Sequence, residues 1–103
     1  MRESKVEGHL VKRVKETGGI TRKAQWIGHR GAPDRWCGWP ARCGLPFQRQ
    51  PVSGWVETKK PLTPNAAAHQ EREHKRMRAC GERVDVLATI EEVDAYIKEM
   101  TGE

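Results

Sequence analysis

The chain has 103 residues, with 19 lysine and arginine residues against 14 aspartate and glutamate residues, a net charge of +5 and a pI near 9.4. This length predicts a single domain over residues 1–103 with a modest core, and leaves little room for a second one. The basic balance favours a polyanionic partner such as nucleic acid, because lysine and arginine displace counterions from a phosphate backbone.

The cysteine content and the hydropathy pattern indicate where such a chain works. Cys37, Cys43 and Cys80 cannot all pair within one chain, which argues against a disulfide framework and for a reducing compartment. No stretch reaches the ~18 apolar residues of a membrane span, and the charged N-terminus lacks the apolar core of a signal peptide. We therefore expect a cytoplasmic protein.

The first expected element is a helix over residues 4–17. Its apolar stripe at helical spacing consists of Val6, Leu10, Val11 and Val14. Ser4 and Glu7 fit a capping box at its start, and Gly18-Gly19 ends it. The middle of the chain then predicts a strand at 21–28, a turn at 29–35, a strand at 35–39, a loop at 40–51 and a strand at 52–59. Pro33 pushes Ala32 into an extended conformation, so Asp34 enters its strand on a defined path.

The second half begins with a helix signal, because Thr63 can cap and Pro64 suits a first turn. This helix should run to about Cys80 and be closed by Gly81. A strand at 83–88 follows, and then a final helix with a capping box from Thr89 and Glu92. Its apolar stripe is Ile90, Val93, Ile97 and Met100.

The resulting order is α-β-β-β-α-β-α. A helix between the strands at 52–59 and 83–88 favours a parallel, right-handed crossover. We expect an α/β fold in which helices flank a small mixed sheet.

The candidate chemistry lies in Pro33-Asp34, separated by 22 residues from Glu57-Thr58-Lys59. Side chains alternate along a strand, so Glu57 and Lys59 should share a face and meet Asp34 from the neighbouring strand. Two adjacent carboxylates attract a divalent cation, and an all-oxygen site with waters suits Mg²⁺ or Mn²⁺. The Thr58 carbonyl is a natural further ligand, and Lys59 could orient the attacking water. The alternative is a surface salt bridge between Glu57 and Lys59.

Two helices carry possible supporting residues. The inner face of the helix at 64–80 should include Ala66, Ala67, Gln70, Met77 and Cys80. A buried Gln70 needs partners, which an active site or the core edge would supply. Glu7 could hold a metal-bound water, or it could simply complete the capping box with Ser4.

The combination of these segments resembles a known family. Segments 30–35 (RGAPDR) and 55–59 (WVETK) resemble the VRR-NUC domain of the PD-(D/E)xK nucleases, which have a restriction-endonuclease-like core. Residues 2–7 resemble that family's opening helix, and residues 69–87 its closing half. The likeness covers nearly the whole chain and is greatest to stand-alone phage and prophage forms.

The resemblance implies Mg²⁺- or Mn²⁺-dependent hydrolysis of DNA by a homodimer that acts on branched substrates, including four-way junctions. It implies that Asp34 and Glu57 bind metal, that Lys59 is the catalytic lysine, and that Glu7 and Gln70 assist. The segment between Asp34 and Glu57 is longer than usual for the family, and Thr58 replaces a residue that is more often apolar.

Other residues leave alternatives open. The spacing of Cys37 and Cys43 does not fit a zinc knuckle. Trp26 and Trp55 are expected in the core, whereas Trp36 and Trp39 suit DNA contact or dimer packing. DNA contact is also expected of five basic residues, Arg30, Arg35, Arg72, Lys75 and Arg76, although the helical ones could form a solvated face.

Three functions fit these features. The first is a structure-selective endonuclease working as a dimer on two strands. The second is a nuclease of the same fold that nicks ordinary duplex or flapped DNA. The third is a DNA-binding module without activity, which the joint presence of Asp34, Glu57 and Lys59 disfavours.

Overall fold

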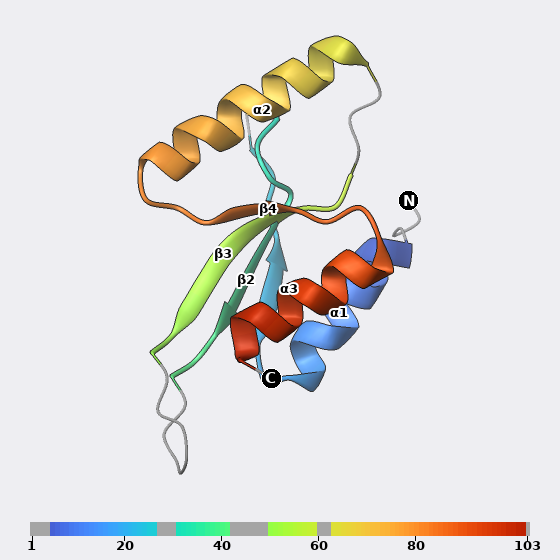
Figure 1. Ribbon diagram of the computed structural model, residues 1–103, viewed down its shortest axis with the longest axis vertical. Helices are drawn as coiled ribbons and strands as arrows, with labels where there is room; N and C mark the ends of the chain where they lie inside the picture. The colour runs from blue at the N-terminus through green and yellow to red at the C-terminus, as the bar shows by residue number, and fades with distance from the viewer. Residues whose placement is uncertain (1–4, 27–30, 42–49, 60–62, 103) are drawn as a thin grey trace.

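The computed structural model describes residues 5–26, 31–41, 50–59 and 63–102 and contains a four-stranded mixed sheet with three helices (Figure 1). The elements are α1 (Lys5–Glu16), β1 (Ile20–Lys23), β2 (Arg35–Trp39), β3 (Val52–Glu57), α2 (Pro64–Ala79), β4 (Val84–Val86) and α3 (Ile90–Thr101). The strand order is β1-β2-β3-β4, antiparallel except for the parallel β3–β4 pair. The α/β class, the element order and the parallel crossover are as the sequence predicts.

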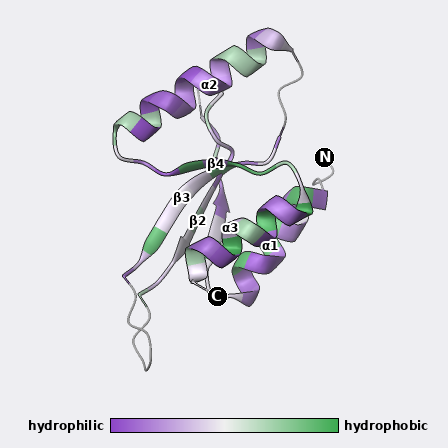
Figure 2. Cartoon of the chain, in the orientation of Figure 1, coloured by the Kyte–Doolittle hydropathy of each residue, from purple (hydrophilic) through white to green (hydrophobic). Residues whose placement is uncertain are grey.

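One face of the sheet packs against α1 and α3 and forms the core. Alternation along β2 points Arg35, Cys37 and Trp39 toward this face, and Val56 of β3 joins them. The core cluster consists of Leu10, Val14, Cys37, Trp39, Val56, Leu87, Val93, Tyr96, Ile97 and Met100. Figure 2 shows the apolar bands of α1 and α3 turned toward each other and toward the sheet.

The other face of the sheet meets α2, which lies near β4 at one end of the sheet (Figure 1). This helix is largely hydrophilic (Figure 2), and His74 is its one buried residue within the described chain. Cys80 was predicted on the inner face of α2, but it is the exposed C-cap of that helix. Helical spacing from Gln70 instead brings His74 inward, four residues later.

Helix boundaries follow the expected caps. Thr63 accepts a hydrogen bond from the Ala66 amide at 3.1 Å, and Thr89 accepts one from the Glu92 amide at 3.1 Å. The Glu92 carboxylate reaches back to the Ala88 amide at 3.1 Å, one residue before the cap. Ser4, the expected cap of α1, lies outside the described residues.

Three predicted strands are shorter in the structure. The strand expected at 21–28 is Ile20–Lys23, and the Trp26 indole beyond it donates a hydrogen bond to the Pro33 carbonyl at 2.7 Å; residues 27 and 28 lie outside the described residues. The strand expected at 52–59 ends at Glu57, and the one expected at 83–88 spans Val84–Val86. No helix in the described part of the chain is long and apolar enough to cross a membrane.

Candidate active site

The two candidate carboxylates lie opposite each other on neighbouring strands. The register pairs Arg35 of β2 with Val56 of β3, which places Asp34 across from Glu57. Because Arg35 and Val56 point toward the core, Asp34 and Glu57 point to the face that carries α2. The two carboxylates therefore meet as expected, because Asp34 and Glu57 stand one position beyond the paired residues Arg35 and Val56.

Backbone hydrogen bonds fix both residues. The Ala24 amide donates to the Asp34 carbonyl at 2.8 Å, so the β1–β2 pairing extends to the site. The Leu87 amide donates to the Glu57 carbonyl at 2.9 Å, which ties Glu57 to the end of β4. The Trp26 indole holds the carbonyl of Pro33, directly before Asp34. The carboxylates thus project from backbone that is hydrogen-bonded to the neighbouring strands.

The residues after Glu57 close around the pair. The Thr58 amide donates to Asp34 Oδ1 at 3.4 Å, and its hydroxyl donates to Asp34 Oδ2 at 3.3 Å. The Lys59 amide donates to Glu57 Oε1 at 3.2 Å. Thr58 is buried and Lys59 is exposed, so the lysine stands at the solvent side of the pair.

Glu57 is the electrostatically perturbed member of the pair. Burial raises its pKa, with a further rise from the Asp34 charge, to about 7. Hydrogen bonds from the Lys59 amide and the Gln70 side chain, together with the Lys59 charge, only partly offset this. The site therefore holds a carboxylate pair that is short of positive charge, a condition that a divalent cation would relieve.

Gln70 reaches this pair from α2, as the sequence predicts, and its side chain hydrogen-bonds Glu57. The helix is held there by a close approach of the segment that leads into Asp34. A Cβ at Gly31 would lie 2.5 Å from the Gln70 backbone nitrogen and 2.6 Å from the His69 carbonyl carbon. Gly31 also has a positive φ of 80°, so both its conformation and its lack of a side chain suit this contact.

His74 is the residue that sequence reasoning missed. Its side chain is only 2% exposed, and it hydrogen-bonds the backbone of Gly31. Burial lowers its pKa, and the nearby Arg78 lowers it further, which favours the neutral ring. Its Nε2 atom has no hydrogen-bond partner within the described chain. The i, i+4 spacing from Gln70 was the signal that could have identified it.

Glu7 lies elsewhere, on the core side of the sheet. It is 2% exposed, and its Oε2 atom accepts a hydrogen bond from Arg35 Nε at 2.8 Å and lies 3.7 Å from Lys23 Nζ. No three histidine, cysteine, aspartate or glutamate residues within the described ranges are placed to hold one metal ion. The structure thus brings Gln70, but not Glu7, to the carboxylate pair.

Arg35 was expected to contact DNA, but the structure buries it inside the protein. It is 8% exposed, and its guanidinium is bonded to Glu7 inside the protein. Strand alternation explains this, since the residue after Asp34 must point to the opposite face. Arg72, Lys75 and Arg76 are exposed on α2, and Arg30 lies outside the described residues.

The burial of the tryptophans also differs from the prediction. Trp39 is 3% exposed and donates to Thr17 Oγ1 at 2.9 Å, so it belongs to the core. Trp26 and Trp55, expected in the core, are half-buried and pack together with ring centroids 5.1 Å apart. Cys37 and Cys80 are free thiols, and Cys43 lies outside the described residues.

Comparisons with known proteins place this chain in a family. No protein-family model matches the chain. The chain is 37% identical over 87 residues to a protein named "Putative nuclease p44" from Acyrthosiphon pisum secondary endosymbiont phage 1, covering 84% of this chain and 83% of that protein. A solved structure titled "VRR_NUC domain" matches with a TM-score of 0.66 and 33% identity over 90% of each chain.

The chain belongs to the VRR-NUC family. The likeness extends over the whole fold of this VRR-NUC protein rather than over one motif, since 90% of the chain is covered. The nuclease name printed for the phage relative belongs to that protein, and the site itself is described by the strand register that sets Asp34 across from Glu57.

Proposed function

We propose that this VRR-NUC protein is a divalent-metal-dependent DNA endonuclease. The observation that carries the proposal is the pairing of Asp34 with Glu57 across β2 and β3, with the pKa of Glu57 raised to about 7 by burial and by Asp34. Perturbed carboxylates of this kind concentrate at functional sites. The nuclease name of the phage relative and the family membership support the same activity.

The donor set fits a hard cation. Mg²⁺ keeps several waters and usually takes one or two protein carboxylates, which is what Asp34 and Glu57 offer. The Thr58 carbonyl is proposed as a further oxygen ligand. When bound, Mg²⁺ or Mn²⁺ polarises the scissile phosphodiester and lowers the pKa of a bound water.

The protein's own groups have separate tasks in this proposal. Lys59 stands at the exposed side of the pair, where its ammonium can orient the attacking water and balance charge on the phosphate. Gln70 holds Glu57 by a hydrogen bond from α2. Glu7, bonded to Arg35 on the core side of the sheet, would act on the site through β2 rather than through a water on the metal.

We further propose a homodimer that selects branched DNA such as four-way junctions, in the cytoplasm of a bacterial host of a phage or prophage. Cutting two strands calls for two active sites, which a small chain supplies by pairing. The net charge of +5 and the exposed Arg72, Lys75 and Arg76 of α2 support DNA as the partner.

The test is cleavage of a labelled four-way junction beside linear duplex of the same sequence, with Mg²⁺, Mn²⁺ or EDTA. We expect metal-dependent cutting of the junction that Asp34→Ala abolishes while folding and DNA binding persist. Asp94→Ala, which removes an exposed carboxylate on α3, should cut like the wild type.

The other outcomes discriminate among the alternatives. Equal cutting of both substrates would retain the nuclease and reject the structural selectivity. Full activity of Asp34→Ala would reject the site. Tight binding without cutting of either DNA would favour a binding module.

A further inference from the structure

A row of side chains crosses the sheet one step away from the carboxylates and on the same face. The register aligns Arg22 of β1 with Trp36 of β2 and with Trp55 of β3. Trp36 lies two residues after Asp34, and Trp55 two residues before Glu57, so both tryptophans share the face of the carboxylates. Two residues along a strand correspond to about 7 Å, roughly the spacing of neighbouring nucleotides in an extended strand.

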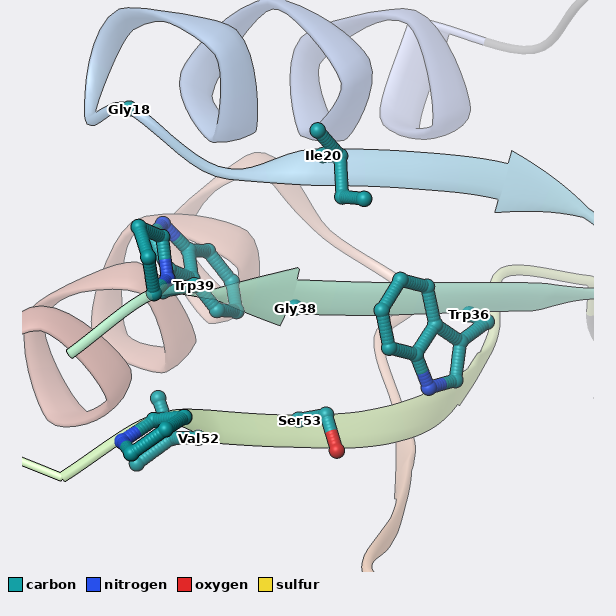
Figure 3. Close-up of a pocket in the computed structure, with 9 residues that line it drawn as sticks. Gly18, Ile20, Trp36, Gly38, Trp39, Val52 and Ser53 are labelled. Atoms are coloured by element: carbon teal, nitrogen blue, oxygen red, sulfur yellow. The ribbon is translucent and has the colours of Figure 1, made fainter.

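The sheet is hollowed around Trp36. One cavity of about 460 Å³ is bordered by Ile20, Trp36 and Val52, and another of about 370 Å³ is bordered by Trp36, Trp55 and Arg83 (Figure 3 shows the first). Trp36 therefore contributes to both hollows. Their volumes fall in the range of small-molecule pockets, which suits a planar ring of the size of a nucleobase.

Trp36 is held in place by a neighbouring glycine. A Cβ at Gly38 would lie 2.4 Å from Trp36 Cη2 and 2.8 Å from its Cζ2, so the indole occupies the space that a side chain would fill. Trp55, by contrast, is covered by Trp26 and donates to Glu82 Oε1 at 3.0 Å. Both tryptophans border the second hollow, but of the two it is Trp36 that also borders the first.

Positive charge stands at the end of the same row. Arg22 is exposed and uses one guanidinium nitrogen to bond the Thr21 carbonyl at 2.8 Å, so further N–H donors remain available. An aromatic side chain beside an arginine is the arrangement that binds a base together with its phosphate.

We infer that the Arg22–Trp36–Trp55 row is a binding site for unpaired DNA, in which a nucleobase stacks on Trp36 and its phosphate binds Arg22. The site would take a single-stranded segment next to the phosphodiester at Asp34 and Glu57. A second copy of this basic chain is a poorer occupant, because Arg22 would meet like charge. The inference rests on the proposed function only in taking DNA as the ligand.

Binding is measured in EDTA, so that no cleavage is needed. A labelled short oligothymidylate and a duplex of the same length are titrated with the protein by fluorescence anisotropy. We expect the wild type to bind the single strand, and Trp36→Ala to weaken that binding about tenfold. Trp36→Phe should restore most of the affinity, because a ring is retained. Duplex binding should change far less in both variants.

Three further variants separate stacking from folding and from net charge. Gly38→Ala keeps the indole but displaces it, and it should reproduce the loss seen with Trp36→Ala. Arg22→Gln should weaken single-strand binding, whereas Lys12→Gln, which removes the same charge from an exposed position on α1, should have little effect. Quenching of tryptophan fluorescence by the oligonucleotide should shrink in Trp36→Phe.

Unchanged single-strand affinity in Trp36→Ala and Gly38→Ala would overturn the inference. So would a change in oligomeric state without a change in DNA binding, which would make the row a contact between copies. If the wild type cuts DNA while these variants bind single strands normally, the inference fails and the nuclease proposal stands. If single strands bind through Trp36 but no substrate is cut, the nuclease proposal fails alone.

Discussion

Glu57 combines two roles that conflict in the metal-free protein. As a buried strand residue it helps to close the sheet next to Leu87, yet its carboxylate faces Asp34 from the adjacent strand. Burial and the Asp34 charge raise its pKa from 4.5 to about 7. Near neutral pH the protein is therefore close to the point where Glu57 gains or loses its proton, and a bound cation would favour the ionised form.

This raised pKa predicts how stability depends on pH without metal. Between pH 4.5 and 7 the folded state binds more protons at Glu57 than the unfolded state does, so the free energy of unfolding should fall as the pH rises through this range. Glu57→Gln removes this titration, so the stability of the variant relative to the wild type should be more favourable at pH 8 than at pH 4, by roughly 3 kcal/mol. Urea unfolding in EDTA at the two pH values measures it.

Glu71→Gln provides the control, because it removes an exposed carboxylate from α2, next to Gln70. It should leave the pH slope as in the wild type. Identical slopes for the wild type and Glu57→Gln would show that Glu57 does not titrate in this range, and would count against the close carboxylate pair.

At this scale the sequence is informative about residues that strand geometry alone brings together. Asp34 and Glu57 could be paired because alternation and one neighbouring strand suffice. The position of Glu7 could not be predicted, since it depends on Arg35, which becomes a buried partner only once β2 is packed against α1. Trp39 was assigned to the surface for a similar reason, because its burial depends on Thr17 and α3.

At the scale of elements, the site depends on how α2 meets the segment before β2. Gly31 contacts the α2 backbone at His69 and Gln70, and His74 hydrogen-bonds the same glycine from the next turn of the helix. Gln70 can reach Glu57 only while this contact holds the helix close to the strands. We therefore regard Gly31 and His74 as positioning residues for Gln70.

Gly31→Ala should separate α2 from the site. Gly18→Ala is a matched control, because Gly18 also has a positive φ, 84°, but nothing lies within 4 Å of its added Cβ. Gly18→Ala should cost about 1 kcal/mol of unfolding free energy and leave cleavage intact. Gly31→Ala should cost more and should lower cleavage at least tenfold under conditions where the protein remains folded, as checked by circular dichroism.

Equal effects of the two substitutions on cleavage would mean that the contact between Gly31 and α2 does not position the site. The elements themselves followed from local signals, such as the Thr63 and Thr89 caps and the crossover between β3 and β4. The exact ends of the strands did not follow from such signals, because contacts such as the hydrogen bond from the Trp26 indole to the Pro33 carbonyl form only between separate segments.

At the scale of the whole molecule, the small core limits stability and makes pairing of two chains advantageous. We expect light scattering at micromolar concentration to give the mass of two chains rather than that of one 11.7-kDa chain. The Asp34→Ala variant should form the same dimer, since the proposed function gives Asp34 a role in metal binding and none in pairing the chains. A monomer at this concentration would count against the dimer, and with it against paired cutting of two strands.

The outer strands restrict how such a dimer could be built. β1 has four residues, including the exposed Arg22 and Lys23, and β4 has only three. Short, charged edge strands oppose the addition of a further strand. Two copies would therefore not merge into one continuous eight-stranded sheet, but would meet through helices or sheet faces. The two catalytic centres would then be set by a rigid-body contact, and a change at that contact could alter the spacing of the two cuts without touching either carboxylate pair.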